Sequence, residues 1–105
     1  MSNGKTFFLE VITPREMFFS GDVEMVIVTT RDGEEGFMKN HQWCVALLAD
    51  EGRLQIRLPG ETEKRVAYLK GGHIDVKDQT VVYAEEARWK FSGLFLELKG
   101  ADMVI

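Results

Sequence analysis

The sequence has very few of the residues from which disulfides and metal sites are built. It contains one cysteine, Cys44, and two histidines, His41 and His73. A single cysteine excludes an internal disulfide, and the chain has neither a CxxC pair nor an HExxH motif. His41, Cys44, His73 and Asp75 would form a metal site only if all four side chains converged. We expect no bound metal, and we expect Cys44 to be a small residue of the core.

Long apolar runs and excess positive charge are also absent. No apolar run approaches the roughly 20 residues needed to span a bilayer, and no basic N-terminus leads into an apolar signal segment. We therefore expect a reducing compartment and membrane association only through a partner. The formal net charge of -4 offers nothing that would attract a polyanion, so nucleic acid is not an expected partner.

Motifs for catalysis are missing as well. Ser20-Gly21 lies outside any GxSxG context, and Gly33-x-x-Gly36 lacks the Lys-Ser/Thr ending of a phosphate-binding loop. Glu34 and Glu35 are adjacent, so on a loop their carboxylates would point apart and stay solvated rather than share acid-base work. We expect no catalytic residue and no cofactor.

The sequence does show a globular composition and a strand pattern. Its 105 residues are 45% hydrophobic and 29% charged, which fits one compact domain with a tail. Leu54, Ile56 and Leu58 alternate with polar residues, and Pro59-Gly60 then predicts a hairpin with Val66 in its second arm. Short runs with turn signals between them predict an all-β sandwich or barrel. Strands are expected over residues 6–13, 22–30, 36–38, 43–48, 54–58, 66–70, 73–76 and 80–84.

The longest expected strand, Asp22–Thr30, has apolar residues on both faces and precedes an acidic loop at Arg31–Glu35. Gly21 is expected to provide a bend or bulge before it. Residues 85–89 are compatible with the start of a helix, and the path of residues 89–105 is left open because later leucines alternate as in a strand.

Several segments together form a recognisable series. They are Phe8–Pro14, Phe19–Val28, Gly33–Gly36 with His41, Gly71–Val76 and Thr80–Val82. In order and spacing, over roughly residues 6–86, this series resembles the N-terminal domain of the epsilon subunit of F-type ATP synthases, which is called delta in mitochondria. The set of segments is specific, although no single one of them is decisive.

The resemblance implies a β-sandwich of two antiparallel sheets with a structural rather than a catalytic role. Such a domain sits at the foot of the central stalk, packs against the gamma subunit and touches the membrane c-ring, so that rotation of the ring is passed to gamma and coupled to ATP synthesis. The expected location is peripheral, on the cytoplasmic face of the bacterial inner membrane or its organelle equivalent, as part of the F1 sector.

Site residues follow from the same resemblance. Glu34 matches the acidic loop residue of the family and His41 its loop histidine, and both are expected to face the c-ring, whose polar loops commonly carry basic residues. The contact with gamma is expected to use apolar residues of a sheet face, for which Val26, Val28 and Phe37 are the candidates.

The chain departs from the family pattern in three places, one of which is Lys70-Gly71-Gly72-His73, where the family commonly has Ser-Gly-Gly-Phe. The family usually has Pro-Gly-His-Ala-Pro where this chain has Lys39-Asn40-His41-Gln42-Trp43. The family also continues into a two-helix C-terminal domain that inhibits ATP hydrolysis and in some members binds ATP. We expect residues 1–86 to form the sandwich and residues 87–105 a short tail, with no inhibitory hairpin and no ATP site.

An alternative from another functional class is a free-standing β-sandwich that binds a small ligand or peptide. A deep apolar pocket with convergent polar groups would favour this alternative, whereas a flat apolar sheet face would favour the stalk subunit.

Overall fold

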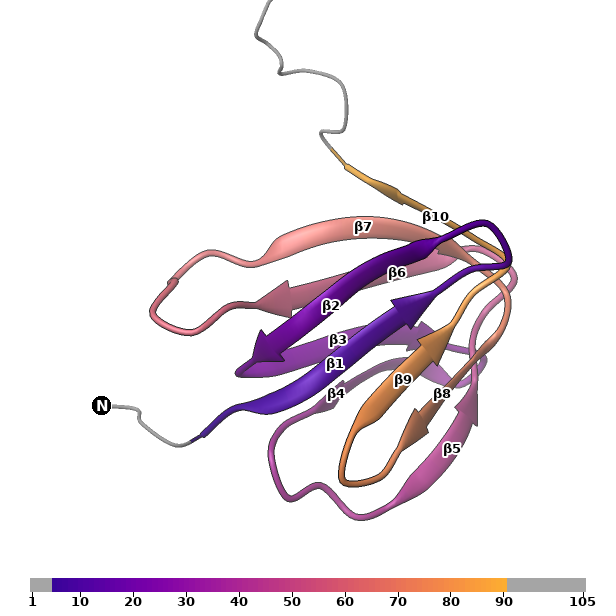
Figure 1. Ribbon diagram of the computed structural model, residues 1–105. Helices are drawn as coiled ribbons and strands as arrows, with labels where there is room; N and C mark the ends of the chain where they lie inside the picture. Colours follow the sequence, from indigo (N-terminus) through magenta and orange to yellow (C-terminus); the bar gives the residue numbers. More distant parts are fainter. Residues whose placement is uncertain (1–4, 91–105) are drawn as a thin grey trace, which may run out of the picture.

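The computed structural model describes residues 5–90, and all regular structure within them is β-strand. The expected all-β sandwich is confirmed (Figure 1). The strands are β1 (Phe7–Ile12), β2 (Met17–Val23), β3 (Met25–Thr30), β4 (Gly33–Phe37), β5 (Cys44–Leu47), β6 (Gly52–Arg57), β7 (Arg65–Lys70), β8 (His73–Val76), β9 (Thr80–Tyr83) and β10 (Glu86–Trp89).

The strands form two five-stranded sheets. Sheet A has the order β2-β1-β9-β8-β5, and sheet B has the order β10-β7-β6-β3-β4. Neighbouring strands are antiparallel except β1 and β9, which are parallel, with Leu9 opposite Thr80 and Ile12 opposite Tyr83. The expected two-sheet sandwich is therefore antiparallel throughout sheet B and mainly antiparallel in sheet A, where β1 and β9 form one parallel pair.

The core lies between the two sheets and is made of the inward-facing residues of the strands. Leu9 and Val11 of β1, with Ile74 of β8, are completely buried on the side of sheet A. Leu54 and Ile56 of β6 are completely buried on the side of sheet B, as their alternation predicts. Burying each such side chain contributes about 1.5 to 3 kcal/mol, so this double layer is the main source of stability.

The chain crosses from one sheet to the other at Glu24, which divides the single strand expected over Asp22–Thr30. Val23 pairs with Phe7 in sheet A, whereas Met25 pairs with Arg57 in sheet B. The Glu24 amide donates to the Arg57 carbonyl at 2.8 Å, and the Glu24 carboxylate lies 3.3 Å from the Arg57 guanidinium. The expectation of one continuous strand was wrong because both halves have apolar residues and differ only in their pairing partners.

A bulge lies in β2 at Phe18 rather than at Gly21. The register shifts between Val11, which is opposite Phe19, and Ile12, which is opposite Met17, so Phe18 is the extra residue. In a bulge of this kind, two consecutive side chains, here those of Phe18 and Phe19, can point to the same face of the strand. The Phe18 ring stacks on Trp89 at 4.7 Å and the Phe19 ring meets it edge-on at 6.2 Å, which joins the edge strands β2 and β10 of the two sheets.

Strand β10 settles the open assignment at residues 85–89. Glu86 pairs with Lys70 and Trp89 with Ala67, so this segment adds an edge strand to sheet B instead of starting a helix. The division expected after residue 86 therefore falls inside a strand. The remaining expected tail and the leucine alternation after residue 90 lie outside the described residues.

The break expected at Gly71-Gly72 is confirmed. Both glycines have positive φ, at 59° and 97°, where other residues are strained. A Cβ on Gly72 would also overlap the backbone carbonyl of Tyr83. The tight passage from β7 in sheet B to β8 in sheet A therefore requires glycine.

Candidate partner-binding surfaces

The odd-numbered strands all run toward the same end of the sandwich, at the right of Figure 1. The connections β1–β2, β3–β4, β5–β6, β7–β8 and β9–β10 therefore gather there. Exposed acidic residues outnumber basic ones in these connections and the residues beside them. The acidic side chains are Glu16, Asp32, Glu34, Asp50, Glu51, Glu85 and Glu86, and the basic ones are Arg15, Arg31, Arg53 and Lys70. We call this region the acidic end.

Glu34 lies at the acidic end, but in a strand rather than in a loop. The turn between β3 and β4 consists of Arg31 and Asp32, and Glu34 of β4 pairs with Thr29 of β3. The Glu34 carboxylate accepts a hydrogen bond from the Arg53 guanidinium at 2.8 Å, with both side chains close to half exposed. The expectation of a loop over residues 31–35 was wrong, because the turn is only two residues long. Pairing with β3 overrides the low strand propensity of Gly and Glu.

His41 lies in the connection between β4 and β5, at the opposite end from Glu34. Its ring meets Phe37 at 4.6 Å, and its Nδ1 lies 2.7 Å from the Gln42 carbonyl oxygen. Asn40 before it has a φ of 69°, a left-handed conformation that Asn tolerates better than most residues. Glu34 and Phe37 are already about 10 Å apart along β4, so the structure does not bring Glu34 and His41 together.

The three residues expected to contact gamma are core residues. Val26 and Val28 are completely buried, and Phe37 is 1% exposed. They point from β3 and β4 into the space between the sheets and pack in the hydrophobic core. They have no accessible surface, so the expectation that they contact a partner has to be corrected.

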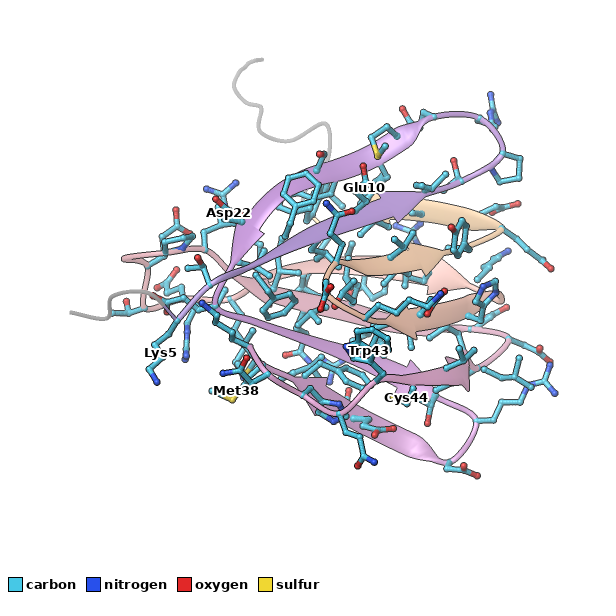
Figure 2. The ribbon with its side chains drawn as sticks, turned by 60° about the horizontal axis from the view of Figure 1, so that its bottom comes forward. Lys5, Glu10, Asp22, Met38, Trp43 and Cys44 are labelled. Carbon is cyan, nitrogen blue, oxygen red and sulfur yellow. The ribbon has the colours of Figure 1, made fainter. Side chains whose placement is uncertain are left out.

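Exposed apolar side chains gather on β5 instead. Trp43, Val45 and Leu47 are 63%, 64% and 55% exposed, while Cys44 and Ala46 between them pack against the core. Tyr83 of β9 is 40% exposed in the same row of sheet A, because Leu47 and Tyr83 both pair with His73. We call Trp43, Val45, Leu47 and Tyr83 the β5 face; Trp43 is labelled in Figure 2.

Sequence reasoning missed the β5 face because both faces of β5 are apolar. The signal present in the sequence is size: the small side chains Cys44 and Ala46 alternate with the large ones of Trp43, Val45 and Leu47. Small residues fit beneath an edge strand that packs closely on the core, which leaves the large ones outside. Alternation alone did not say which set faces inward.

The surroundings of Cys44 disfavour the thiolate form of its side chain. Burial raises its pKa above the ordinary value, and the nearby carboxylates of Glu35 and Asp75 raise it further. A raised pKa lowers the thiolate fraction at neutral pH, and the thiolate is the nucleophile and metal ligand. Within residues 5–90 no group of three or more metal-binding side chains comes together.

Several hollows lie on the surface of the described residues. One of about 330 Å³, beside Tyr83, is lined mostly by apolar residues such as Ile12 and Pro14. A groove of about 320 Å³ lies over β6, β7 and β10, between Arg53, Tyr68 and Arg88. The Arg88 guanidinium lies over the Tyr68 ring at 4.9 Å, which is a cation–π contact. In the part of the chain that the structure describes, no helix could span a membrane.

Comparison with known proteins identifies the family of the sandwich. Residues 6–90 match the family described as "ATP synthase, Delta/Epsilon chain, beta-sandwich domain". The ATP synthase epsilon chain of Caldanaerobacter subterraneus subsp. tengcongensis is 40% identical over 86 residues, which are 81% of this chain and 61% of that protein. The sodium ion specific epsilon chain of Propionigenium modestum is 37% identical over 83 residues, 78% of this chain and 58% of that protein. The chain thus spans about three fifths of the length of these curated relatives.

Solved structures share the fold. A chain of the mitochondrial ATP synthase of Euglena gracilis, solved with OSCP, F1 and the c-ring, superposes with a TM-score of 0.73 at 24% identity, covering 80% of this chain and 53% of that one. A chain of the Tetrahymena thermophila mitochondrial ATP synthase central stalk and c-ring superposes with a TM-score of 0.66 at 12% identity, covering 94% and 79%. With the match over residues 6–90, these findings show that the chain belongs to the ATP synthase delta/epsilon family, through its β-sandwich domain.

Proposed function

We propose that this protein is a non-catalytic rotor subunit of an F-type ATP synthase that joins the gamma subunit to the c-ring. It then couples ion-driven rotation to ATP synthesis without binding a nucleotide or metal of its own. Membership of the delta/epsilon family supports this role, as do relatives named ATP synthase epsilon chain. The location that follows is peripheral, in the F1 sector on the cytoplasmic face of the bacterial inner membrane or the equivalent side of an organelle membrane.

The observation that carries the proposal is the β5 face. Its side chains Trp43, Val45 and Leu47 are each more than half exposed on one edge of sheet A. Side chains of this size, gathered on a flat sheet surface, are typical of a protein interface rather than of a ligand pocket. We assign this face to gamma, in place of the buried residues that the sequence indicated. An exposed apolar sheet face also favours the subunit over a free-standing module for a small ligand or peptide.

The acidic end is assigned to the c-ring. Its net negative charge complements the basic residues that c-ring loops of the family commonly carry, and Glu34 lies within it. Each exposed pair contributes only about 0.2 to 1 kcal/mol, so no single residue dominates. Together the charges steer the orientation in which the sandwich meets the ring. His41 lies at the other end and packs on Phe37, so we assign it the positioning of the β4–β5 connection.

Coupling requires that the two surfaces belong to one stiff body. The β5 face lies on the flat side of sheet A, and the acidic end is formed by the turns at which β5 and β9 finish. Both are attached to the same buried core, so torque received at the turns reaches the sheet face with little internal motion.

Co-purification tests the role directly. The full chain is mixed with the gamma subunit and c-ring of the same source, and the complex is weighed by native mass spectrometry. We expect a stoichiometric complex with gamma that Val45→Glu and Leu47→Glu weaken, because each substitution buries a charge in the interface. Met17→Glu is the matched control, because Met17 is 50% exposed on the far edge strand β2. A monomer that ignores gamma would refute the proposal.

A further inference from the structure

Two carboxylates stand among the apolar residues on the outer side of sheet A. The register across the sheet places Val45 of β5 beside Asp75 of β8, Asp75 beside Val81 of β9, and Val81 beside Glu10 of β1. Neighbouring strands lie about 4.8 Å apart, so Asp75 and Glu10 stand roughly 10 Å from each other with Val81 between them. Figure 2, with Trp43 and Glu10 labelled, spans this face from β5 to β1.

Asp75 lacks a hydrogen-bond donor for one of its oxygens. Its Oδ1 is buried and has no hydrogen-bond partner among residues 5–90, while its Oδ2 lies 3.8 Å from the Lys77 ammonium nitrogen. That distance is too long for a hydrogen bond, so Lys77, whose side chain is 62% exposed, holds the carboxylate only loosely. A desolvated carboxylate oxygen without a donor is unfavourable in the isolated protein.

Glu10 lacks even a loose ion pair of this kind in the part of the chain that the structure describes. It is half-buried on β1, and among residues 5–90 it takes part in no ion pair. The β5 face beside Asp75 is apolar, so a partner that covers it would exclude water from both carboxylates. Exclusion of water strengthens an ion pair that is completed and makes one that is not completed more costly.

We propose that Asp75 and Glu10 are the specificity-determining residues of the β5 face and that each accepts hydrogen bonds from a cationic side chain of the docked partner. This inference rests on the proposed function, so the occupant is gamma. Ionised carboxylates only accept, so the partner must donate. Arginine fits Asp75 best, because its planar fork can donate to both oxygens once docking displaces Lys77 and opens the buried Oδ1 to the interface. A second copy of this chain would bring carboxylates against carboxylates and is disfavoured.

The test measures the affinity of the full chain for purified gamma at low and high salt. We expect Asp75→Asn to weaken binding about tenfold or more and to reduce its salt dependence, and Glu10→Gln to act in the same direction. Asp78→Asn, on the exposed turn beside β8, is the matched control and should bind as the unsubstituted chain does. Removal of an unsatisfied charge should leave the melting temperature of Asp75→Asn unchanged or raised, so weaker binding would not reflect misfolding.

The outcomes separate this inference from the function on which it rests. If Val45→Glu abolishes binding while Asp75→Asn binds within twofold of the unsubstituted chain, the carboxylate assignment is wrong and the face assignment stands. If neither substitution changes binding, or if gamma does not bind, both are wrong. A native mass that shows a homodimer sealed by the β5 face would replace gamma by a second copy and overturn the inference.

Discussion

At the scale of single residues, two glycines in connections separate two reasons for requiring glycine: a positive φ and a lack of room for a Cβ atom. Gly72, between β7 and β8, has a φ of 97°, and a Cβ there would overlap the Tyr83 carbonyl. Gly60, in the β6–β7 hairpin, has a φ of 80° but has nothing within 4 Å of a Cβ. The first position combines strain with a clash, and the second has strain alone.

Gly72→Ala should lower the free energy of unfolding by about 2 kcal/mol or more, and Gly60→Ala by about 1 kcal/mol. The difference measures the close approach between the β7–β8 connection and β9. Urea denaturation of both variants, followed by circular dichroism, checks the order. Equal losses would show that the backbone at Tyr83 gives way.

The thiol of Cys44 gives a second prediction at this scale. Burial, and then the charges of Glu35 and Asp75, raise its pKa, so alkylation by iodoacetamide should reach half its maximal rate at a higher pH than for a free cysteine. Because the folded chain holds this proton more tightly than the unfolded chain does, the associated stability is complete below the ordinary thiol pKa and is lost as the pH rises through the raised one. Glu35→Gln should shift the midpoint of alkylation downward, and an unmoved midpoint would contradict the assigned cause.

At the scale of strands, the contact between β2 and β10 closes one side of the sandwich. Phe18 and Phe19 reach Trp89 only because the bulge in β2 turns consecutive side chains to the same side. Trp43, by contrast, is 63% exposed on the β5 face. The two tryptophans therefore differ in setting: Trp89 packs between the edge strands of the two sheets, whereas Trp43 is exposed on the face that we assign to a partner.

Trp89→Ala should destabilise the chain by about 2 to 3 kcal/mol, because it removes the ring that joins the edge strands of the two sheets. Trp43→Ala should change stability by no more than about 0.5 kcal/mol. Thermal unfolding of the two variants measures both losses of stability and compares them. A Trp89→Ala chain as stable as the Trp43→Ala chain would mean that the β2–β10 contact adds little to the fold.

The local alternation of apolar and polar residues predicted a strand correctly where pairing with neighbouring strands also favours one. Leu54 and Ile56 alternate with polar residues, and they do lie in a half-buried strand. Glu34 and Glu35 have low strand propensity, so a strand was expected only from Gly36 onward; pairing with β3 extends β4 back to Gly33. Residues 86–89 became β10 by pairing with β7, although they are compatible with a helix. Long-range pairing decides such segments, and the local sequence does not contain it.

The candidate site was predictable only in part for a related reason. Glu34 stands out in the sequence as an exposed acidic residue, and the structure keeps it exposed beside Arg53. Val26 and Val28 are as apolar as Val45 and Leu47, so composition does not distinguish core from interface. The layer opposite each strand makes that distinction, because sheet B faces sheet A through Val26 and Val28.

At the scale of the whole molecule, the sandwich presents an apolar side and an acidic end that meet at the turns after β5 and β9. Under the proposed function, the apolar side would bury surface and supply attachment, whereas the acidic end would act through charge and set orientation. Loss of the first should release gamma. Loss of the second should leave gamma bound and disturb only the contact with the ring.

Glu34→Lys tests the acidic end. Reversal of this charge also repels Arg53, so c-ring attachment should weaken by a factor of up to about five, and coupling of ATP hydrolysis to proton pumping should fall. The fold should persist, with stability changed by less than about 1 kcal/mol. Glu63→Lys, exposed in the β6–β7 hairpin at the opposite end, is the matched control. Unchanged pumping by the Glu34→Lys complex would count against the assignment.

The direction in which the strands run also determines where the protein is best held. Lys5 leads into β1, and the Lys90 amide donates to the Val66 carbonyl at the start of β7, so both lie at the end away from the acidic turns. A fluorophore or bead linker placed at either position would leave the charged turns and the β5 face uncovered. Immobilised in this way, the sandwich would present both docking surfaces to solution at once, as a single-molecule rotation assay needs.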